Sequence, residues 1–157
     1  MPDAGEAAPL FELPGDAGKP LALAQLKGRV AVLYFYPKDD TSGCTSEAKD
    51  FSNLAGEFAK AGIAVVGISP DSAASHAKFK AKHGLAVHLA ADEDKTVAQA
   101  YGVWVEKTMY GRRYMGVERS TFLIDAQGRV AQVWRRVKVP GHAKAVLDAA
   151  QRLAGHK

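Results

Sequence analysis

Two continuous apolar runs, separated by a segment of helical periodicity, constrain the fold of this 157-residue chain more than any other feature. Residues 30–36 read Val-Ala-Val-Leu-Tyr-Phe-Tyr and residues 63–68 read Ile-Ala-Val-Val-Gly-Ile. Strands that are buried on both faces have this unbroken apolar character, which is typical of parallel sheets. Between the runs, apolar residues recur at helical spacing. The pattern therefore predicts a βαβ unit, with strands over 30–36 and 63–68 and a helix over about 44–60.

The rest of the chain predicts further elements around this unit. Residues 11–13 and 21–23 flank a Pro-Gly-Asp-Ala-Gly segment, which indicates a short N-terminal hairpin. A second hairpin signal is Asp125-Ala-Gln-Gly128. A parallel βαβ unit followed by an antiparallel hairpin and a helix is typical of an α/β thioredoxin-like fold, with a central mixed sheet flanked by helices. The remaining expected elements are helices over about 72–83, 95–101 and 142–153, and strands over 87–90, 121–124 and 130–137.

Composition limits the class of protein. With 47% hydrophobic residues the chain suffices for one sizeable core, so we expect a single domain over residues 1–157. The apolar runs are strand-sized, and the N-terminus lacks the basic and apolar regions of a secretory signal. One cysteine excludes a disulfide scaffold and fits a reducing compartment, which predicts a cytoplasmic protein. The net charge of +4 is modest. A solvated face, rather than a nucleic-acid surface, is expected for Arg112, Arg113, Arg135, Arg136 and Lys138.

The single cysteine, Cys44, lies where the first apolar run has ended and the helical pattern begins. Unpaired N–H groups and the helix dipole at a helix N-terminus favour an anion, and the thiolate is the nucleophilic form of a thiol. Cys44 begins the apolar face of the predicted helix, so its sulfur should be shielded from bulk water. Pro37, Thr41 and Gly43 precede it and suit a tight loop that brings backbone N–H groups close to a ligand.

Pro37-x-x-x-Thr41-x-x-Cys44 resembles the motif that carries the peroxidatic cysteine of the peroxiredoxins. The segment 36–45, Tyr-Pro-Lys-Asp-Asp-Thr-Ser-Gly-Cys-Thr, is similar to the branch known as bacterioferritin comigratory protein or peroxiredoxin Q. The combination with Arg119-Ser-Thr-Phe makes the resemblance specific, and it spans nearly the whole chain. It implies a thioredoxin-like fold of the peroxiredoxin type and an antioxidant, thiol-dependent peroxidase of cell redox homeostasis. Other segments in the order and spacing of that branch are residues 71–72, 75–79, 101–104, 109–111, 114–116 and 119–125.

The resemblance also implies roles for four residues. Cys44 attacks hydrogen peroxide or an alkyl hydroperoxide and becomes a sulfenic acid. Thr41 Oγ1 and the backbone N–H of Cys44 hold the peroxide oxygens. Arg119 stabilises the thiolate and polarises the peroxide, and Pro37 shields the pocket. Glycine-rich nucleotide motifs are absent and the five histidines do not fall in metal-ligand spacing, so we expect no cofactor and no metal.

Two departures from the branch matter. Ser42 stands where members commonly have proline, which slightly loosens the loop. Lys49 stands where many members carry a second, resolving cysteine, and Lys80 lies near the position where a further group carries it, so no intramolecular disulfide can form. We therefore expect a one-cysteine enzyme whose sulfenic acid is reduced by an external thiol: thioredoxin, glutaredoxin or glutathione. We expect a monomer, with a weak or disulfide-linked dimer as the alternative, and neither a nucleic-acid nor a membrane partner.

Three other hypotheses fit parts of the sequence. A hydroperoxide-sensing thiol switch would form the same sulfenic acid and pass its oxidation to a docking partner. A thioredoxin-fold binding module would be indifferent to loss of the Cys44 thiol. A cysteine hydrolase would use His76 or His142 as general base, although no oxyanion or triad signature accompanies either residue. From its sequence neighbours alone, Arg119 would be expected to be a surface arginine paired with Glu118. Only its place in the Arg119-Ser-Thr-Phe motif favours a functional role.

Overall fold

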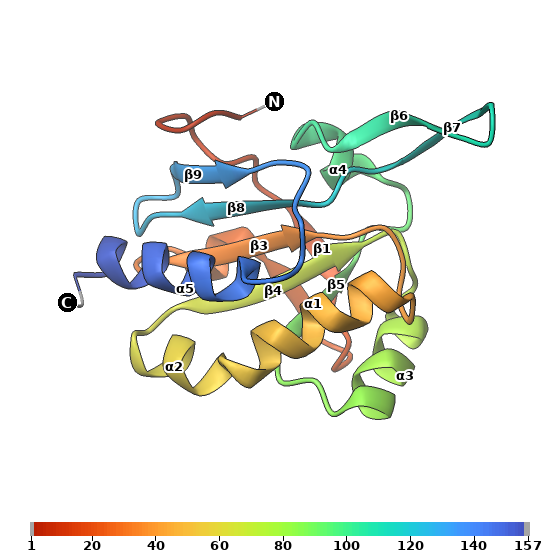
Figure 1. The fold of residues 1–157 in the computed structure, drawn as a ribbon. Coiled ribbons are helices and arrows are strands. Elements are labelled where there is room, and N and C mark those ends of the chain that lie inside the picture. The colour runs from red at the N-terminus through yellow and green to blue at the C-terminus, as the bar shows by residue number, and fades with distance from the viewer. Residues whose placement is uncertain (1, 156–157) are drawn as a thin grey trace.

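The computed structural model describes residues 2–155, and a five-stranded mixed sheet forms its centre (Figure 1). Strands β3, β4 and β5 run parallel, and β8 pairs antiparallel with both β3 and β9, giving the order β5-β4-β3-β8-β9. The predicted βαβ unit and C-terminal hairpin are thereby confirmed. The bounds of these strands are β3 Ala31–Phe35, β4 Ala64–Ser69, β5 His88–Ala91, β8 Ser120–Ile124 and β9 Val130–Trp134.

Helices and the N-terminal segment cover the two faces of this sheet, which is why every residue of β3 is buried. Val32 and Tyr34 face one core cluster, which includes buried residues of α1 (Ser42–Asn53), α2 (Ala55–Lys60), α3 (Ala73–His83) and α5 (His142–Leu153). Leu33 and Phe35 face the other, with α4 (Thr96–Ala100) and the N-terminal segment. The latter contains the predicted hairpin, β1 (Glu12–Pro14) and β2 (Pro20–Ala22), and a 3₁₀ turn, η1 (Leu23–Leu26).

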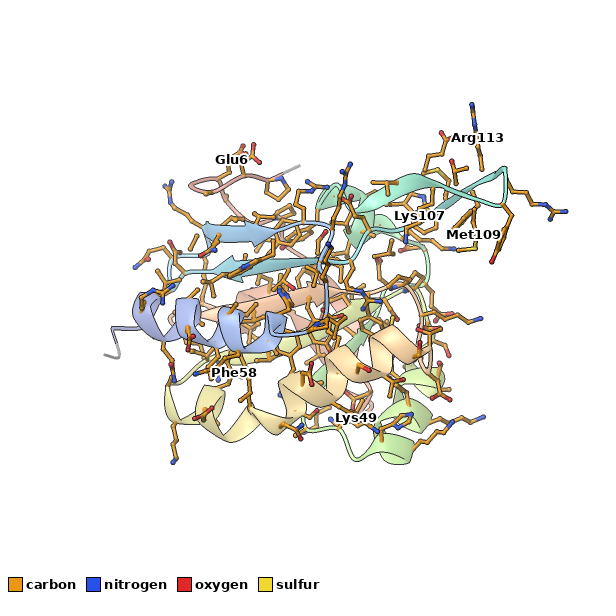
Figure 2. The ribbon with its side chains drawn as sticks, in the orientation of Figure 1. Glu6, Lys49, Phe58, Lys107, Met109 and Arg113 are labelled. Atoms are coloured by element: carbon orange, nitrogen blue, oxygen red, sulfur yellow. The ribbon has the colours of Figure 1, made fainter. Side chains whose placement is uncertain are left out.

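The expected single helix over about 44–60 is wrong, because the structure has two helices that meet at Leu54. Leu54 N–H donates to Phe51 O at 3.1 Å, so the last turn of α1 tightens before α2 begins. Asn53 and Gly56 flank this point and both have low helix propensity. The break still leaves Phe58 buried beside α5 (Figure 2).

A second hairpin, β6 (Trp104–Met109) with β7 (Arg112–Val117), was not predicted from the sequence. It projects from the body of the molecule (Figure 1). Both residues of its two-residue turn, Tyr110 and Gly111, have positive φ (52° and 77°), as in a type I′ turn. The strands are largely exposed, so they lack the apolar alternation that marks a half-buried strand.

The predicted solvated basic face is divided among separate ion pairs. Arg113 on β7 pairs with Glu106, whereas Arg135 and Arg136, beyond β9, both pair with Glu118. These two glutamates offset part of the positive charge. None of the helices in the described part of the chain is long and apolar enough to cross a membrane.

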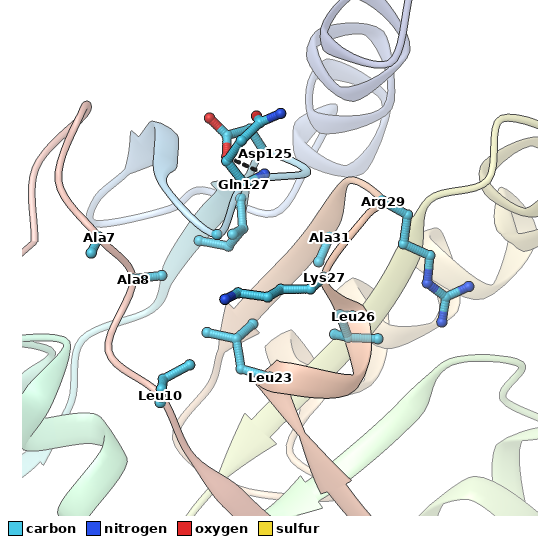
Figure 3. Close-up of a pocket in the computed structure, with 12 residues that line it drawn as sticks. Ala7, Ala8, Leu10, Leu23, Leu26, Lys27, Arg29, Ala31, Asp125 and Gln127 are labelled. Atoms are coloured by element: carbon cyan, nitrogen blue, oxygen red, sulfur yellow. Dashed lines mark hydrogen bonds between the residues drawn. The ribbon is translucent and has the colours of Figure 1, made fainter.

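A mainly apolar cavity of about 190 Å³ lies at the end of the sheet opposite to Cys44 (Figure 3). Ala31 at the start of β3 and Ile124 at the end of β8 contribute to its wall, with Leu23 and Leu26 of η1. Its lining contains neither cysteine nor histidine, and the reactive thiol lies at the other end of β3.

Candidate active site

Cys44 is the third residue of α1 and lies just beyond the carboxyl end of the central strand β3. The first helical hydrogen bond runs from Thr45 N–H to Thr41 O at 2.8 Å, so the N–H groups of Ser42, Gly43 and Cys44 have no intrahelical acceptor. The residue is 1% exposed. The predicted helix N-terminus and the shielding of the sulfur are both confirmed, and the free N–H groups can receive an anion.

Arg119 joins the sulfur to a buried carboxylate. Its Nη2 donates to Cys44 Sγ at 3.3 Å and its Nη1 donates to Glu47 Oε1 at 2.6 Å. A Cβ atom added at Gly43 would lie 3.2 Å from Nη2, so glycine leaves room for this close approach. Burial alone would lower the pKa of Arg119, but Glu47 and Cys44 raise it above its ordinary value. The guanidinium is therefore a permanent positive charge beside the thiol.

Glu47 was missed by the sequence analysis, although it follows Cys44 by three residues on α1 and therefore shares its buried face. The side chain is 1% exposed, and its Oε2 has no hydrogen-bond partner among the described residues. Burial raises the pKa of Glu47 to about 7, while the charge and the hydrogen bond of Arg119 oppose that rise. A glutamate on the apolar side of a helix was the signal that should have singled it out.

Glu47 should make stability depend on pH. Its pKa rises from 4.5 to about 7 on folding, so the folded state retains a proton that the unfolded chain releases between these values. This contribution is fully present below pH 4.5 and is lost as the pH rises through 7. Relative to Glu47→Gln, we expect the free energy of unfolding of the parent to fall by up to about 3 kcal/mol over that interval.

Urea unfolding at a series of pH values, with the thiol kept reduced, measures this difference. Glu57→Gln is the matched control, because Glu57 carries the same charge on the exposed side of α2. A parent-minus-Glu47→Gln difference that stays constant from pH 4.5 to pH 8 would contradict the prediction.

Thr41 and Pro37 lie in the loop between β3 and α1. Thr41 is the N-cap residue of α1, and its Oγ1 donates to Lys38 O at 2.9 Å instead of capping the helix. The lone pairs of Oγ1 consequently remain able to accept a hydrogen bond. Pro37 is half-buried. Among the described contacts, neither side chain hydrogen-bonds to Cys44, so their proposed roles concern a bound peroxide rather than the thiol.

The same loop is tied to α3 by a buried polar network. Asp39 accepts hydrogen bonds from Tyr36 at 2.6 Å and from Ser75 at 2.8 Å, and its Oδ2 lies 2.7 Å from His76 Nδ1. The backbone N–H of Asp39 donates to Asp71 at 2.8 Å. These bonds, together with Tyr36 N–H to Ile68 O, fix the chain that leads from β3 to Cys44.

Asp40, the next loop residue, adds an outer attachment to the same helix. It has a positive φ of 60° and accepts hydrogen bonds from Lys82 at 2.6 Å and, on its other oxygen, from His83 at 2.8 Å. These two partners lower the pKa of Asp40. Neither attachment was foreseen, because residues more than 30 positions apart form them.

One group of the described residues has the geometry to surround a metal ion. It consists of Asp39, Asp71 and His76, whose ligand atoms lie within 4.8 Å of one another. Their oxygens already accept hydrogen bonds from Tyr36, Ser75, Ser69 and backbone N–H groups. His76 Nε2 faces Ala90 O at 3.0 Å. The group is therefore internally satisfied, and its chemistry is that of a structural network rather than a vacant ligand set.

Neither histidine considered for a cysteine hydrolase pairs with Cys44. His76 bonds within the network around Asp39. His142 Nε2 lies 2.8 Å from Thr121 Oγ1, and burial, with a contribution from Arg119, lowers the pKa of His142 to about 4. The group that contacts the sulfur is a guanidinium, which cannot act as a general base at neutral pH.

Comparison with known proteins agrees with this geometry. The model of the AhpC/TSA family matches residues 4–133. The chain belongs to this family. It is 49% identical over 145 residues to a putative peroxiredoxin Bcp of Coxiella burnetii, covering 92% of this chain and 96% of that protein. It is 48% identical over 144 residues to peroxiredoxin Bcp of Bacillus subtilis, covering 92% of each. The chain is thus a peroxiredoxin of the Bcp and peroxiredoxin Q branch, a thiol-dependent peroxidase.

Solved structures of relatives have the same fold. The bacterioferritin comigratory protein of Xanthomonas campestris matches with a TM-score of 0.90 at 44% identity, over 97% of this peroxiredoxin and 99% of that chain. A mutant of Xylella fastidiosa peroxiredoxin Q gives 0.92 at 37% identity, over 97% of both. The predicted α/β fold of the peroxiredoxin type is confirmed. Two solved mutants of Xanthomonas peroxiredoxin Q each replace a different cysteine. If the first of those cysteines corresponds to Cys44, the spacing between the two places the second at Lys80 of this chain.

Proposed function

We propose that Cys44 of this peroxiredoxin reduces hydrogen peroxide and organic hydroperoxides and is itself restored by an external thiol. The thiolate attacks the terminal peroxide oxygen, the O–O bond breaks, and water or an alcohol leaves while the sulfur becomes a sulfenic acid. The observation that carries the proposal is the buried sulfur at a helix N-terminus, 3.3 Å from the guanidinium of Arg119. The alkyl peroxide reduction named for the Xanthomonas relative supports organic hydroperoxides as substrates.

Ionisation of the thiol accounts for only part of the rate that such an enzyme needs. An ordinary thiol with a pKa of about 8.5 is roughly 3% ionised at pH 7, so full ionisation gains only about 30-fold. The remainder has to come from holding the peroxide in line and stabilising charge on its oxygens. We assign this to the N–H groups at the start of α1, to Thr41 Oγ1 as acceptor, to Arg119, and to Pro37 as a shield of the pocket.

Regeneration of the thiol requires a second molecule, because this chain has no second cysteine. The external thiol attacks the sulfenic sulfur and releases water, and a further thiol then reduces the mixed disulfide. Thioredoxin, glutaredoxin and glutathione are the candidate reductants of a monomer, and a disulfide between two copies of Cys44 is the dimeric alternative. A single free cysteine suits a reducing compartment, so we infer a cytoplasmic location.

Intact-protein mass after one equivalent of peroxide tests this function. Without a reductant, the monomer should gain one oxygen, and more under excess peroxide as sulfinic acid accumulates. With glutathione, it should become a glutathionylated monomer or a Cys44–Cys44 dimer. Peroxide consumption over many turnovers then separates a peroxidase from a stoichiometric thiol switch. An unmodified monomer, or consumption that stops after one equivalent despite excess reductant, would contradict the proposal.

A further inference from the structure

The side of the β6–β7 hairpin that is turned toward the body of the molecule presents an unusual combination of side chains. In the antiparallel register Lys107 lies opposite Tyr114 and Met109 lies opposite Arg112, so these four share one face. Figure 2 places Lys107 and Met109 on the side of the hairpin toward the body of the molecule, whereas Arg113 points away. This inward face of the hairpin is therefore cationic and apolar.

Of the two cations on this face, Lys107 lies closer along the hairpin to Arg119, because it pairs with Tyr114 whereas Arg112 lies two residues nearer to the turn. Its stem lies over Gly116, where an added Cβ would be 3.3 Å from Lys107 Cδ, and Arg119 follows Gly116 by three residues, just past the end of β7. Burial and the charge of Arg119 lower the pKa of Lys107, whereas Cys44 and Glu118 raise it. The ammonium group is thus within electrostatic range of the sulfur.

Unlike Arg119 and Arg113, Lys107 has no counter-charge in contact, and it is less exposed than Arg112, the other cation of this face. Arg119 bonds to Glu47, Arg113 pairs with Glu106, and Lys107 has neither a hydrogen bond nor an ion pair with any residue in the range 2–155. A half-buried cation without a contacting partner loses hydration, and the attraction of Cys44 and Glu118 recovers only part of that loss, since the pKa of Lys107 is lowered on balance. An anionic ligand would supply the missing interaction.

The outer part of the same face is apolar. Met109 is 55% exposed and Tyr114 is 42% exposed. Two large apolar side chains exposed together on the face that carries Lys107 suit a binding surface. Their flexible thioether and flat ring can contact the aliphatic part of a small ligand whose anionic group lies at Lys107.

We propose that Lys107, with Met109 and Tyr114, is a subsite for the carboxylate and aliphatic stem of a small anionic thiol that reduces oxidised Cys44. The proposal rests on the proposed function, since it concerns the second half of that cycle. The sulfenic acid and the bound thiol form a mixed disulfide and release water. A second thiol then attacks the bound ligand's sulfur, which yields a free disulfide and returns the Cys44 thiol.

The anionic group is assigned to the thiol rather than to the peroxide because of what the chain itself contains. With one cysteine, every turnover depends on an external thiol that reaches a sulfur only 1% exposed. Hydrogen peroxide has no carboxylate to recognise. An electrostatic subsite beside Arg119 would raise the local concentration of an anionic thiol and orient it.

Stopped-flow reduction of the preformed sulfenic acid tests the proposal with thiols of different charge: glutathione and 3-mercaptopropionate as anions, and 2-mercaptoethanol as the neutral reference. Lys107→Gln should slow reduction by the two anions about tenfold and change the neutral rate by less than about twofold. Lys107→Arg should retain most of the anion preference. Lys49→Gln is the matched control, because Lys49 has the same charge on the exposed side of α1 (Figure 2).

Each outcome separates this proposal from the function on which it rests. If peroxide does not generate a sulfenic acid, the proposed function fails. If the sulfenic acid forms but Lys107→Gln slows anionic and neutral thiols equally, the subsite is rejected while the peroxidase stands. The subsite is also rejected if Lys107→Gln selectively slows oxidation by a carboxylate-bearing hydroperoxide and leaves thiol reduction unchanged, because the anion then belongs to the peroxide.

Discussion

Cys44→Ser should abolish thiol-dependent peroxide reduction, lowering turnover by more than about 10³-fold to the background rate. A serine hydroxyl is not ionised near neutral pH and cannot form the sulfenic acid from which the second half of the cycle starts. The fold should persist, because the substitution exchanges one small side chain for another at a helix N-terminus. Peroxide consumption under many turnovers measures the loss, and far-UV circular dichroism with urea unfolding measures the fold.

A displaced thiol provides the control for this experiment. The double variant Cys44→Ser, Lys49→Cys retains one cysteine on α1 but moves it to an exposed position away from Arg119. If position rather than the mere presence of a thiol matters, this variant should be as inactive as Cys44→Ser. Turnover of Cys44→Ser within a few-fold of the parent would reject Cys44 as the nucleophile.

Arg119→Ala should slow peroxide attack by about tenfold or more. The substitution removes a positive charge and a hydrogen-bond donor 3.3 Å from the sulfur, so the attacking sulfur and the breaking O–O bond both lose a stabilising group. The alkylation rate reports the reactivity of the thiol, and single-turnover oxidation reports the step with peroxide. Arg119→Lys should recover the positive charge but not the paired donor geometry that serves Sγ and Glu47 together.

Two further variants isolate the cause of this loss. Arg119→Ala leaves Glu47 buried without its partner, so the double variant with Glu47→Gln separates that structural cost from the effect on the thiol. Thr41→Val should slow oxidation while leaving alkylation unchanged, because Thr41 Oγ1 bonds to Lys38 O rather than to the thiol. Unchanged oxidation and unchanged alkylation in both Arg119→Ala and Thr41→Val would rule out the proposed pocket.

Most of the fold was predictable because its signals are local. The apolar run over 30–36 specified a strand buried on both faces, and the loop after it specified where α1 begins. The hairpin β6–β7 escaped prediction because its strands face solvent and carry no apolar periodicity, and only the Tyr110-Gly111 turn marked it. The break at Leu54 was missed because the same apolar face continues across it.

By itself, the sequence determined that one thiol stands at a helix N-terminus after a buried strand and that no second cysteine can reach it. Only the tertiary structure decided which groups surround that thiol. Arg119 lies 75 positions from Cys44, and the Asp39–His76 contact joins residues 37 positions apart. The physical reason is that periodicity and turn chemistry act over a few residues, whereas a salt bridge or buried network forms only after the sheet has brought distant segments together.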